Sequence, residues 1–188
     1  ASSIRMAGAE LFGAAGLAGS VTATGSGALN IFGTSANLGT LVLNASGIAY
    51  TGALTVSPST TGNMDFSAAA TTVTGIDAVD LKAVTGYAGT ITFDSANGTG
   101  VTPNISYVPA AAGTVGALVV ATEGSGLSDS VQLSLGANAA SVTSIGGASI
   151  ETLTIAKSGT GALTLGAVTL TDGVGTQKIV VTSAGAVV

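Results

Sequence analysis

Few side chains in this sequence could carry out covalent or acid–base chemistry, because it contains neither histidine nor cysteine. Without histidine a serine nucleophile lacks its usual base, and without cysteine there is no thiol nucleophile, disulfide or thiolate metal ligand. A lysine could replace the base, but Lys82 and Lys157 stand in "AVDLK" and "TIAKS", not in a Ser-x-x-Lys spacing. We expect both to be solvated lysines at strand ends, and we predict that the chain is not an enzyme.

Paired carboxylates are the second candidate chemistry, since a glycosidase needs two of them a few ångströms apart. Asp77 and Asp80 are close in sequence, but residues three apart on a strand point to opposite faces. Asp77 and Glu151 occupy equivalent places in two similar segments, and we expect them to mark the outer face of a strand or to cap a turn.

Calcium binding is the third candidate, because calcium takes oxygen ligands from Asp, Asn and backbone carbonyls in tight loops. "DSANGTG" offers Asp94 and Asn97 directly after an expected strand, and "TDGVG" offers Asp172 in a comparable place. Asx turns of this kind also form without a metal, and the Gly-Gly-x-Gly-x-Asp repeat of calcium-binding arrays is absent. Asp94, Asn97 and Asp172 are therefore the candidate calcium ligands, and no other cofactor is expected.

The charge content limits the partners of this chain. Charged residues make up 7% of the sequence, against roughly 25% in an ordinary globular domain. Four basic residues cannot neutralise a phosphate backbone, so we expect no nucleic-acid partner. The long uncharged stretch between Asp94 and Glu123 contains Pro103 and Pro109 and is not a continuous apolar span, so we also expect no membrane span. A chain with so few charges either uses Thr, Ser and Asn as its polar face or buries its surface in an assembly.

The elements that would position these side chains are β-strands. Segments such as "TLVLNA", "TITFDS", "SVQLSL" and "KIVVTS" alternate apolar with small or polar residues, and Gly, Asn, Asp or Ser separate them. This is the pattern of strands and tight turns. We predict an all-β fold, a β-solenoid-like or stacked-sheet arrangement of repeats with glycine-rich turns, with a β-sandwich as the alternative.

A five-residue unit of the form Gly-small-apolar-x-apolar recurs along the chain, beginning at residues 27, 39, 52, 89, 116, 161 and 166. The last two copies, "GALTL" and "GAVTL", predict two short strands with glycine at each corner. A longer similarity aligns residues 76–81 with 150–155. It suggests an N-terminal β-rich segment, residues 1–60, and two related strand–loop–strand units in 61–188 that continue from it.

The runs "VTGIDAVDLKAVTGYAGTITF" and "LSDSVQLSLGANAASVTSIGGASIETLTI" resemble the repetitive β-rich regions of bacterial surface-layer proteins that are exported by type I secretion and related to RTX proteins. The strand Ile150–Ile155 and its looser copy Ile76–Leu81 carry the resemblance, which extends over roughly residues 60–185. It implies a secreted structural protein on the bacterial cell surface. The missing calcium nonapeptide is a departure from that family.

Composition and resemblance together predict a structural segment of an extracellular surface layer that self-assembles into a lattice. Self-association is the expected interaction, with cell-surface polysaccharide as a second candidate partner. One alternative is an adhesin or extracellular filament segment, for which Tyr50, Tyr87 and Tyr107 are the available contact residues. Another is an enzyme carried on a β-helix, which would require a groove with clustered acids and bases.

Overall fold

The computed structural model describes residues 2–5, 20–21, 29–39, 42–43, 54–66, 78–94, 103–123, 129–171 and 176–188. Most of them form parallel β-strands that belong to two large sheets. One short helix, α1 (Ser35–Leu38), follows the third strand, and the Thr34 hydroxyl caps it by accepting from the Asn37 amide at 3.2 Å. None of the helices in these ranges is long and apolar enough to cross a membrane.

The larger sheet, called the odd sheet here, contains eight strands in chain order. They are β1 (Ser2–Arg5), β3 (Leu29–Gly33), β5 (Leu54–Pro58), β7 (Ala78–Asp80), β9 (Asn104–Tyr107), β11 (Ser130–Leu135), β13 (Thr152–Lys157) and β15 (Lys178–Ser183). The even sheet contains β6 (Met64–Asp65), β8 (Tyr87–Asp94), β10 (Gly113–Glu123), β12 (Ala140–Ala148) and β14 (Leu163–Thr171). A separate pair joins β2 (Ser20–Val21) to β4 (Val42–Leu43).

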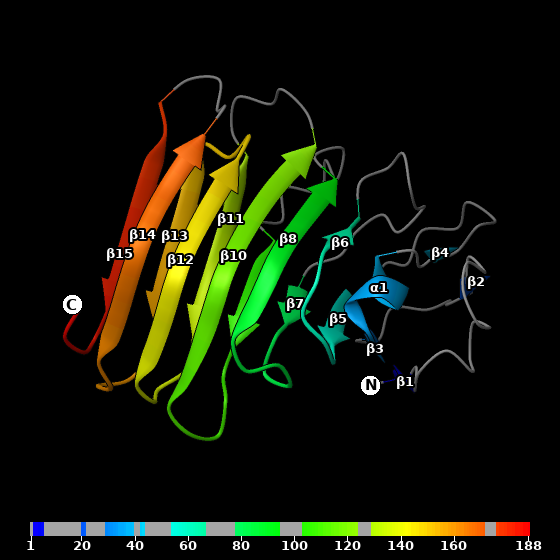
Figure 1. The fold of residues 1–188 in the computed structure, drawn as a ribbon, viewed down its shortest axis with the longest axis horizontal. Coiled ribbons are helices and arrows are strands. Elements are labelled where there is room, and N and C mark those ends of the chain that lie inside the picture. Colours follow the sequence, from blue (N-terminus) through cyan, green and yellow to red (C-terminus); the bar gives the residue numbers. More distant parts are fainter. Residues whose placement is uncertain are drawn as a thin grey trace.

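The chain alternates between the odd and even sheets and so winds into a β-solenoid. Each strand pairs in parallel with the strand two positions along the chain, as β11 does with β13 and β13 with β15. Figure 1 shows the two sheets facing each other with their strands running in opposite directions, as a coil that returns on itself requires. The predicted all-β solenoid of stacked repeats is confirmed.

The coil length varies, and this sets the register between distant repeats. The step from Ser130 to Thr152 takes 22 residues, whereas the step from Asn104 to Gln132 takes 28. Following the register from strand to strand, Ala78 lies in line with Asn104, Gln132 and Thr154. The alignment of residues 76–81 with 150–155 would instead pair Ala78 with Thr152, two residues earlier. The odd sheet also runs without interruption across residue 60, from β5 to β7.

The core lies between the two sheets and consists of apolar columns. In the odd sheet Val79, Ile105, Leu133 and Ile155 stand in line on successive strands, and each is fully buried. Burial alternates along β11 and β13, so every second side chain enters the core. Each coil therefore covers the apolar stripe of its neighbour, which is how a solenoid stabilises itself.

The even sheet breaks this alternation at one level. Val115 pairs with Val142, and Leu118 pairs with Ile145; all four are buried. Two residues separate the buried positions in each strand, where regular alternation would leave one. The same spacing continues into β14, whereas β8 has only one residue there and the register shifts. Strands β10, β12 and β14 thus carry bulges that lie in line across the sheet.

Glycine 166 belongs to this bulge and not to a corner. The prediction of two short strands in "GALTLGAVTL" was wrong, because β14 runs continuously from Leu163 to Thr171. A Cβ on Gly166 would collide with the Thr143 carbonyl oxygen, so glycine lets two bulged backbones approach closely. Corners use other glycines, such as Gly86 and Gly159, whose φ angles are +69° and +68°.

Candidate functional site

The structure describes one of the three predicted calcium ligands, Asp94, at the end of a strand of the even sheet. Asp94 is the last residue of β8 and pairs in register with Glu123, the last residue of β10. Asn97 and Asp172 lie outside the described residues, although Asp172 directly follows Thr171, where β14 ends. Among the residues that the structure describes, no three His, Cys, Asp or Glu side chains are grouped to hold a metal.

Glu123 was missing from the sequence-based set. Its signal is the register itself, because an acidic residue ends each of two neighbouring parallel strands. Recognising the pair requires knowing that Asp94 and Glu123 lie one coil apart, and coil length varies too much for the sequence to give this.

A cluster of polar groups lies where β10 and β12 end. The Thr122 hydroxyl donates to the Ser149 carbonyl at 2.5 Å and lies 3.2 Å from Asp129 Oδ2. Glu151 Oε2 accepts from the Asp129 amide at 2.8 Å, and the Glu151 side chain is only 5% exposed. Ser149 has a φ of 56°, a left-handed conformation that is costly for a non-glycine residue. Glu151 therefore caps a turn, which was one of its two predicted roles; Asp77 lies outside the described residues.

Lys157 forms hydrogen bonds at the turns on the opposite side of the molecule. We expected a solvated lysine, but its side chain is 4% exposed. Its ammonium group donates to the carbonyls of Ala137 at 3.2 Å and Ser158 at 3.0 Å. The expectation was wrong because Lys157 takes an inward position at the end of β13, from which its ammonium group reaches the carbonyls of two turns.

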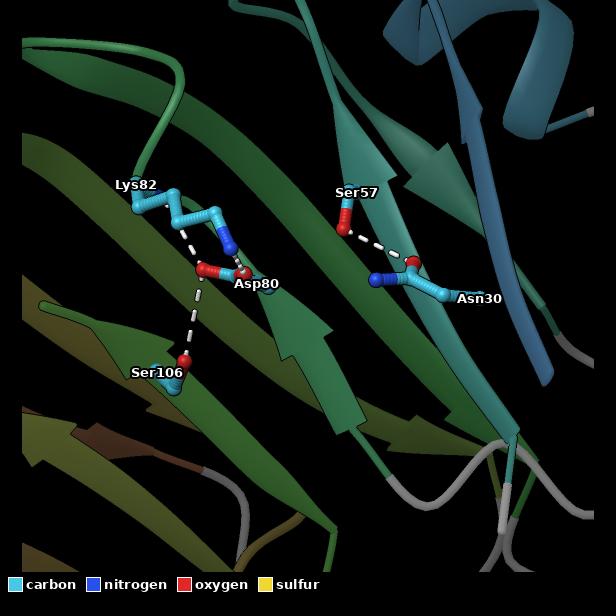
Figure 2. Close-up of polar contacts among 5 residues, drawn as sticks. All are labelled: Asn30, Ser57, Asp80, Lys82 and Ser106. Carbon is cyan, nitrogen blue, oxygen red and sulfur yellow. Dashed lines mark hydrogen bonds and ion pairs between the residues drawn. The ribbon is translucent and has the colours of Figure 1, made fainter. Parts of the chain in front are cut away.

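The outer face of the odd sheet carries hydrogen-bonded polar side chains (Figure 2). Ser57 donates to the Asn30 side-chain oxygen at 3.0 Å, and Asp80 forms an ion pair with Lys82 at 3.0 Å. Lys82 has a 55% exposed side chain, as expected for a solvated lysine. The Ser106 hydroxyl adds a longer contact to Asp80 at 3.4 Å.

The same face continues on later strands with an amide–hydroxyl chain. Gln132 Nε2 donates to Ser134 Oγ at 2.8 Å, and Ser134 Oγ donates to Asn104 Oδ1 at 2.6 Å. The first bond lies within β11, and the second links β11 to β9 in the neighbouring coil. The second bond therefore helps to hold the two strands in register.

The described tyrosines are core residues. Tyr87 and Tyr107 are 0% and 1% exposed, so neither presents a ring to a partner; Tyr50 lies outside the described residues. The Tyr87 hydroxyl donates to the Gly62 carbonyl at 2.5 Å. Burial raises the pKa of Tyr87 from 10.0 to about 12, and a hydrogen bond with Ser35 opposes that rise.

A shallow depression of about 300 Å³ lies where β10, β12 and β14 begin. Its lining consists of small residues, four alanines, one glycine and the hydroxyl residues Thr114, Ser141 and Thr164. The three hydroxyl residues pair in register across the strands. This lining contains no group that titrates, so the depression lacks the acids and bases that a lyase groove would require.

Strands β14 and β15 carry core-type side chains that are partly exposed. Ile179 and Val181 continue the core columns of Leu153 and Ile155, yet they are 43% and 40% exposed. In the even sheet Leu165, Val168 and Leu170 likewise pack on the core while only partly buried. The final coil therefore presents core-type side chains that no described coil covers.

Neither a family model, nor a curated protein, nor a solved structure matches this chain.

Proposed function

We propose that this chain is a structural segment of an extracellular surface layer and that it self-assembles into a lattice. One observation carries the proposal: the described coils stack into a β-solenoid, and charged residues make up only 7% of the sequence. A sparsely charged surface favours burial in an assembly. The resemblance to type I secreted surface-layer proteins supports the cell surface as the location, with cell-surface polysaccharide as a second candidate partner.

The polar groups of the described residues support a structural role over catalysis. Glu151 and Lys157 satisfy backbone groups at corners, and Asp80 pairs with an exposed lysine. Each of these interactions stabilises a turn or a register between coils. We propose that the chain is not an enzyme.

Calcium is the proposed ligand at the strand ends of the even sheet, held by Asp94, Asn97 and Asp172. The paired register of Asp94 and Glu123 supports this, because an acidic residue ends each of two neighbouring strands and calcium prefers carboxylate oxygens. Calcium should then raise the melting temperature, and Asp94→Asn should abolish that rise. An unchanged melting temperature of the wild-type chain over millimolar calcium would remove calcium from the account.

An adhesin or filament segment is the alternative function. Burial of Tyr87 and Tyr107 weakens it, since these rings were its candidate contact residues. The filament version shares the self-association of the main proposal and differs only in the form of the assembly.

Negative-stain microscopy and sedimentation of the purified chain, with calcium and with chelator, test the proposal. We expect sheets or linear assemblies whose amount grows with protein concentration. Monodisperse monomers under all conditions would contradict self-assembly. Monomers that bind cells or glycans would favour the adhesin.

A further inference from the structure

We propose that the outer face of the even sheet binds the same face of a second copy, so that two solenoids lie back to back about a two-fold axis. The inference rests on the proposed self-association and adds its surface and its symmetry. Coils added at either end of a solenoid would lengthen this face without covering it, and the edges of the sheet take no part in the contact.

The outer face of the even sheet lacks charged residues over most of its length. β8, β10, β12 and β14 lie side by side (Figure 1), and their only charged residues, Asp94 and Glu123, are the last residues of β8 and β10. The outward positions between the strand ends hold glycine, alanine, serine and threonine, together with the 38% exposed Val119. On the odd sheet, by contrast, Asp80 forms an ion pair with the exposed Lys82. Removing water from the uncharged face therefore costs less.

The shape of this face fits a reversed copy of itself. Near the start of β10, Thr114 lines the depression of about 300 Å³ together with Ser141. Farther along β10, Val119 is the exposed large apolar residue, and Ala117, which pairs with Ser144, lies between the two levels. A two-fold axis along the Ala117 level reverses the strands and places Val119 of each copy over the depression of the other. Such a contact uses one patch twice and closes on two copies.

The bulge in β10 makes the two halves of this contact nearly equal in length. Val119 lies two residues beyond Ala117, which is about 6.6 Å at about 3.3 Å per residue. Thr114 lies three residues before Ala117, but one of these is the extra residue of the bulge between Val115 and Leu118. Both distances therefore contain two regular steps, as a two-fold contact requires.

The acidic strand ends favour reversed over parallel strands. Asp94 and Glu123 pair in register at the same end of the sheet. With the strands reversed, these residues lie at opposite ends of the contact in the two copies, whereas parallel strands would bring them together. Like charges that meet across an interface oppose association, so the reversed arrangement is the one that we propose.

The size of the face suits a specific contact. β12 and β14 are nine residues long. Four strands of this length, about 4.8 Å apart and rising about 3.3 Å per residue, cover about 570 Å². Two such faces bury about 1,100 Å² in total, above the roughly 1,000 Å² that a specific interface needs.

A matched pair of substitutions tests the location of the contact. Val119→Glu places a charge on the outer face of the even sheet, and Thr154→Glu places the same charge on the outer face of the odd sheet. Both replaced residues are β-branched and neither is buried. By sedimentation equilibrium we expect Val119→Glu to weaken dimerisation by about tenfold or more and Thr154→Glu to change it by less than about twofold. Equal weakening by the two variants, or weakening by Thr154→Glu alone, would overturn the inference.

Cross-linking tests the direction of the strands and needs no added charge. The chain has no cysteine, so Ala112→Cys at the depression and Ala121→Cys near the end of β10 each introduce a single thiol. With a short bismaleimide we expect covalent dimers from a mixture of these two variants and little from either alone. Ala117→Cys, on the two-fold axis, should cross-link by itself. Efficient dimers of Ala112→Cys alone and of Ala121→Cys alone would show parallel strands and overturn the inference.

The outcomes also separate this inference from the proposed function. Dimers that carry the expected cross-links but form no larger assembly would support the face-to-face contact and contradict the lattice. Assemblies that persist with Val119→Glu and give no cross-link in the mixture would overturn the contact and leave self-assembly standing. A wild-type chain that stays monomeric at all concentrations would overturn both.

Discussion

Because of the bulge in the even sheet, two adjacent residues of β10 differ in burial, and the effect of this difference on stability can be measured. Leu118 is fully buried, whereas Val119 is 38% exposed. Uninterrupted alternation from the buried Val115 would instead bury Val119 and expose Leu118. The substitutions Leu118→Ala and Val119→Ala therefore report directly on the bulge.

The expected magnitudes follow from burial. Leu118→Ala removes three carbons from a fully buried site, which costs about 2.4 kcal/mol in transfer free energy at about 0.8 kcal/mol per methylene. The cavity left behind raises the total to about 3–4 kcal/mol, within the range for such substitutions. Val119→Ala removes two carbons from a partly exposed site that solvent can fill, so we expect a loss of about 1 kcal/mol or less.

Urea unfolding followed by circular dichroism measures the difference, at a concentration low enough for the chain to be monomeric. With an m value of about 2–3 kcal/mol/M, Leu118→Ala should lower the midpoint by about 1 M or more, and Val119→Ala should lower it by less than half of that. Equal losses would contradict the bulge. A larger loss for Val119→Ala would show that β10 alternates regularly.

Three further predictions concern a tight backbone contact, a buried tyrosine and a buried lysine. Gly166→Ala should lower the free energy of unfolding by about 1–3 kcal/mol through overpacking, whereas Gly146→Ala, whose Cβ would have 3.6 Å of space, should leave thermal melting nearly unchanged. Because burial raises the pKa of Tyr87 to about 12, its stabilising contribution is complete below pH 10 and is lost as the pH rises toward 12, since the unfolded chain ionises first. Unfolding at pH 8–11.5 should show a loss of about 1–2 kcal/mol that Tyr87→Phe removes; an identical pH profile in both would refute this. Lys157→Met should cost about 1–3 kcal/mol by removing the two hydrogen bonds that the ammonium group donates to carbonyls, and the exposed Lys82→Met should cost under about 0.5 kcal/mol in the same urea titration.

Strand alternation was enough to predict the solenoid, because each coil repeats the same apolar–polar pattern. Along β11 and β13 the pattern gives the buried side correctly. It fails at Gly166, where the sequence repeats like a corner but a glycine is needed for close approach to Thr143. Local pattern cannot distinguish these two uses of glycine, since the neighbour that requires it lies a full coil away.

The same distance limits what the sequence says about the candidate site. Asp94 was identified from its place after a strand, but its register partner Glu123 depends on the length of the intervening coil. Lys157 was expected in solvent because lysine usually is, and only the position of Ala137 in the preceding corner explains its burial. Side chains whose role is set inside one strand were predictable, and those set between coils were not.

Diffraction from assemblies of the purified chain tests the central claim, that stacked β-coils build the proposed assembly. Neighbouring strands in a sheet are about 4.7–4.9 Å apart, so an assembly of intact coils repeats at this spacing. We predict a reflection near about 4.8 Å. Its absence from well-ordered assemblies would contradict the account.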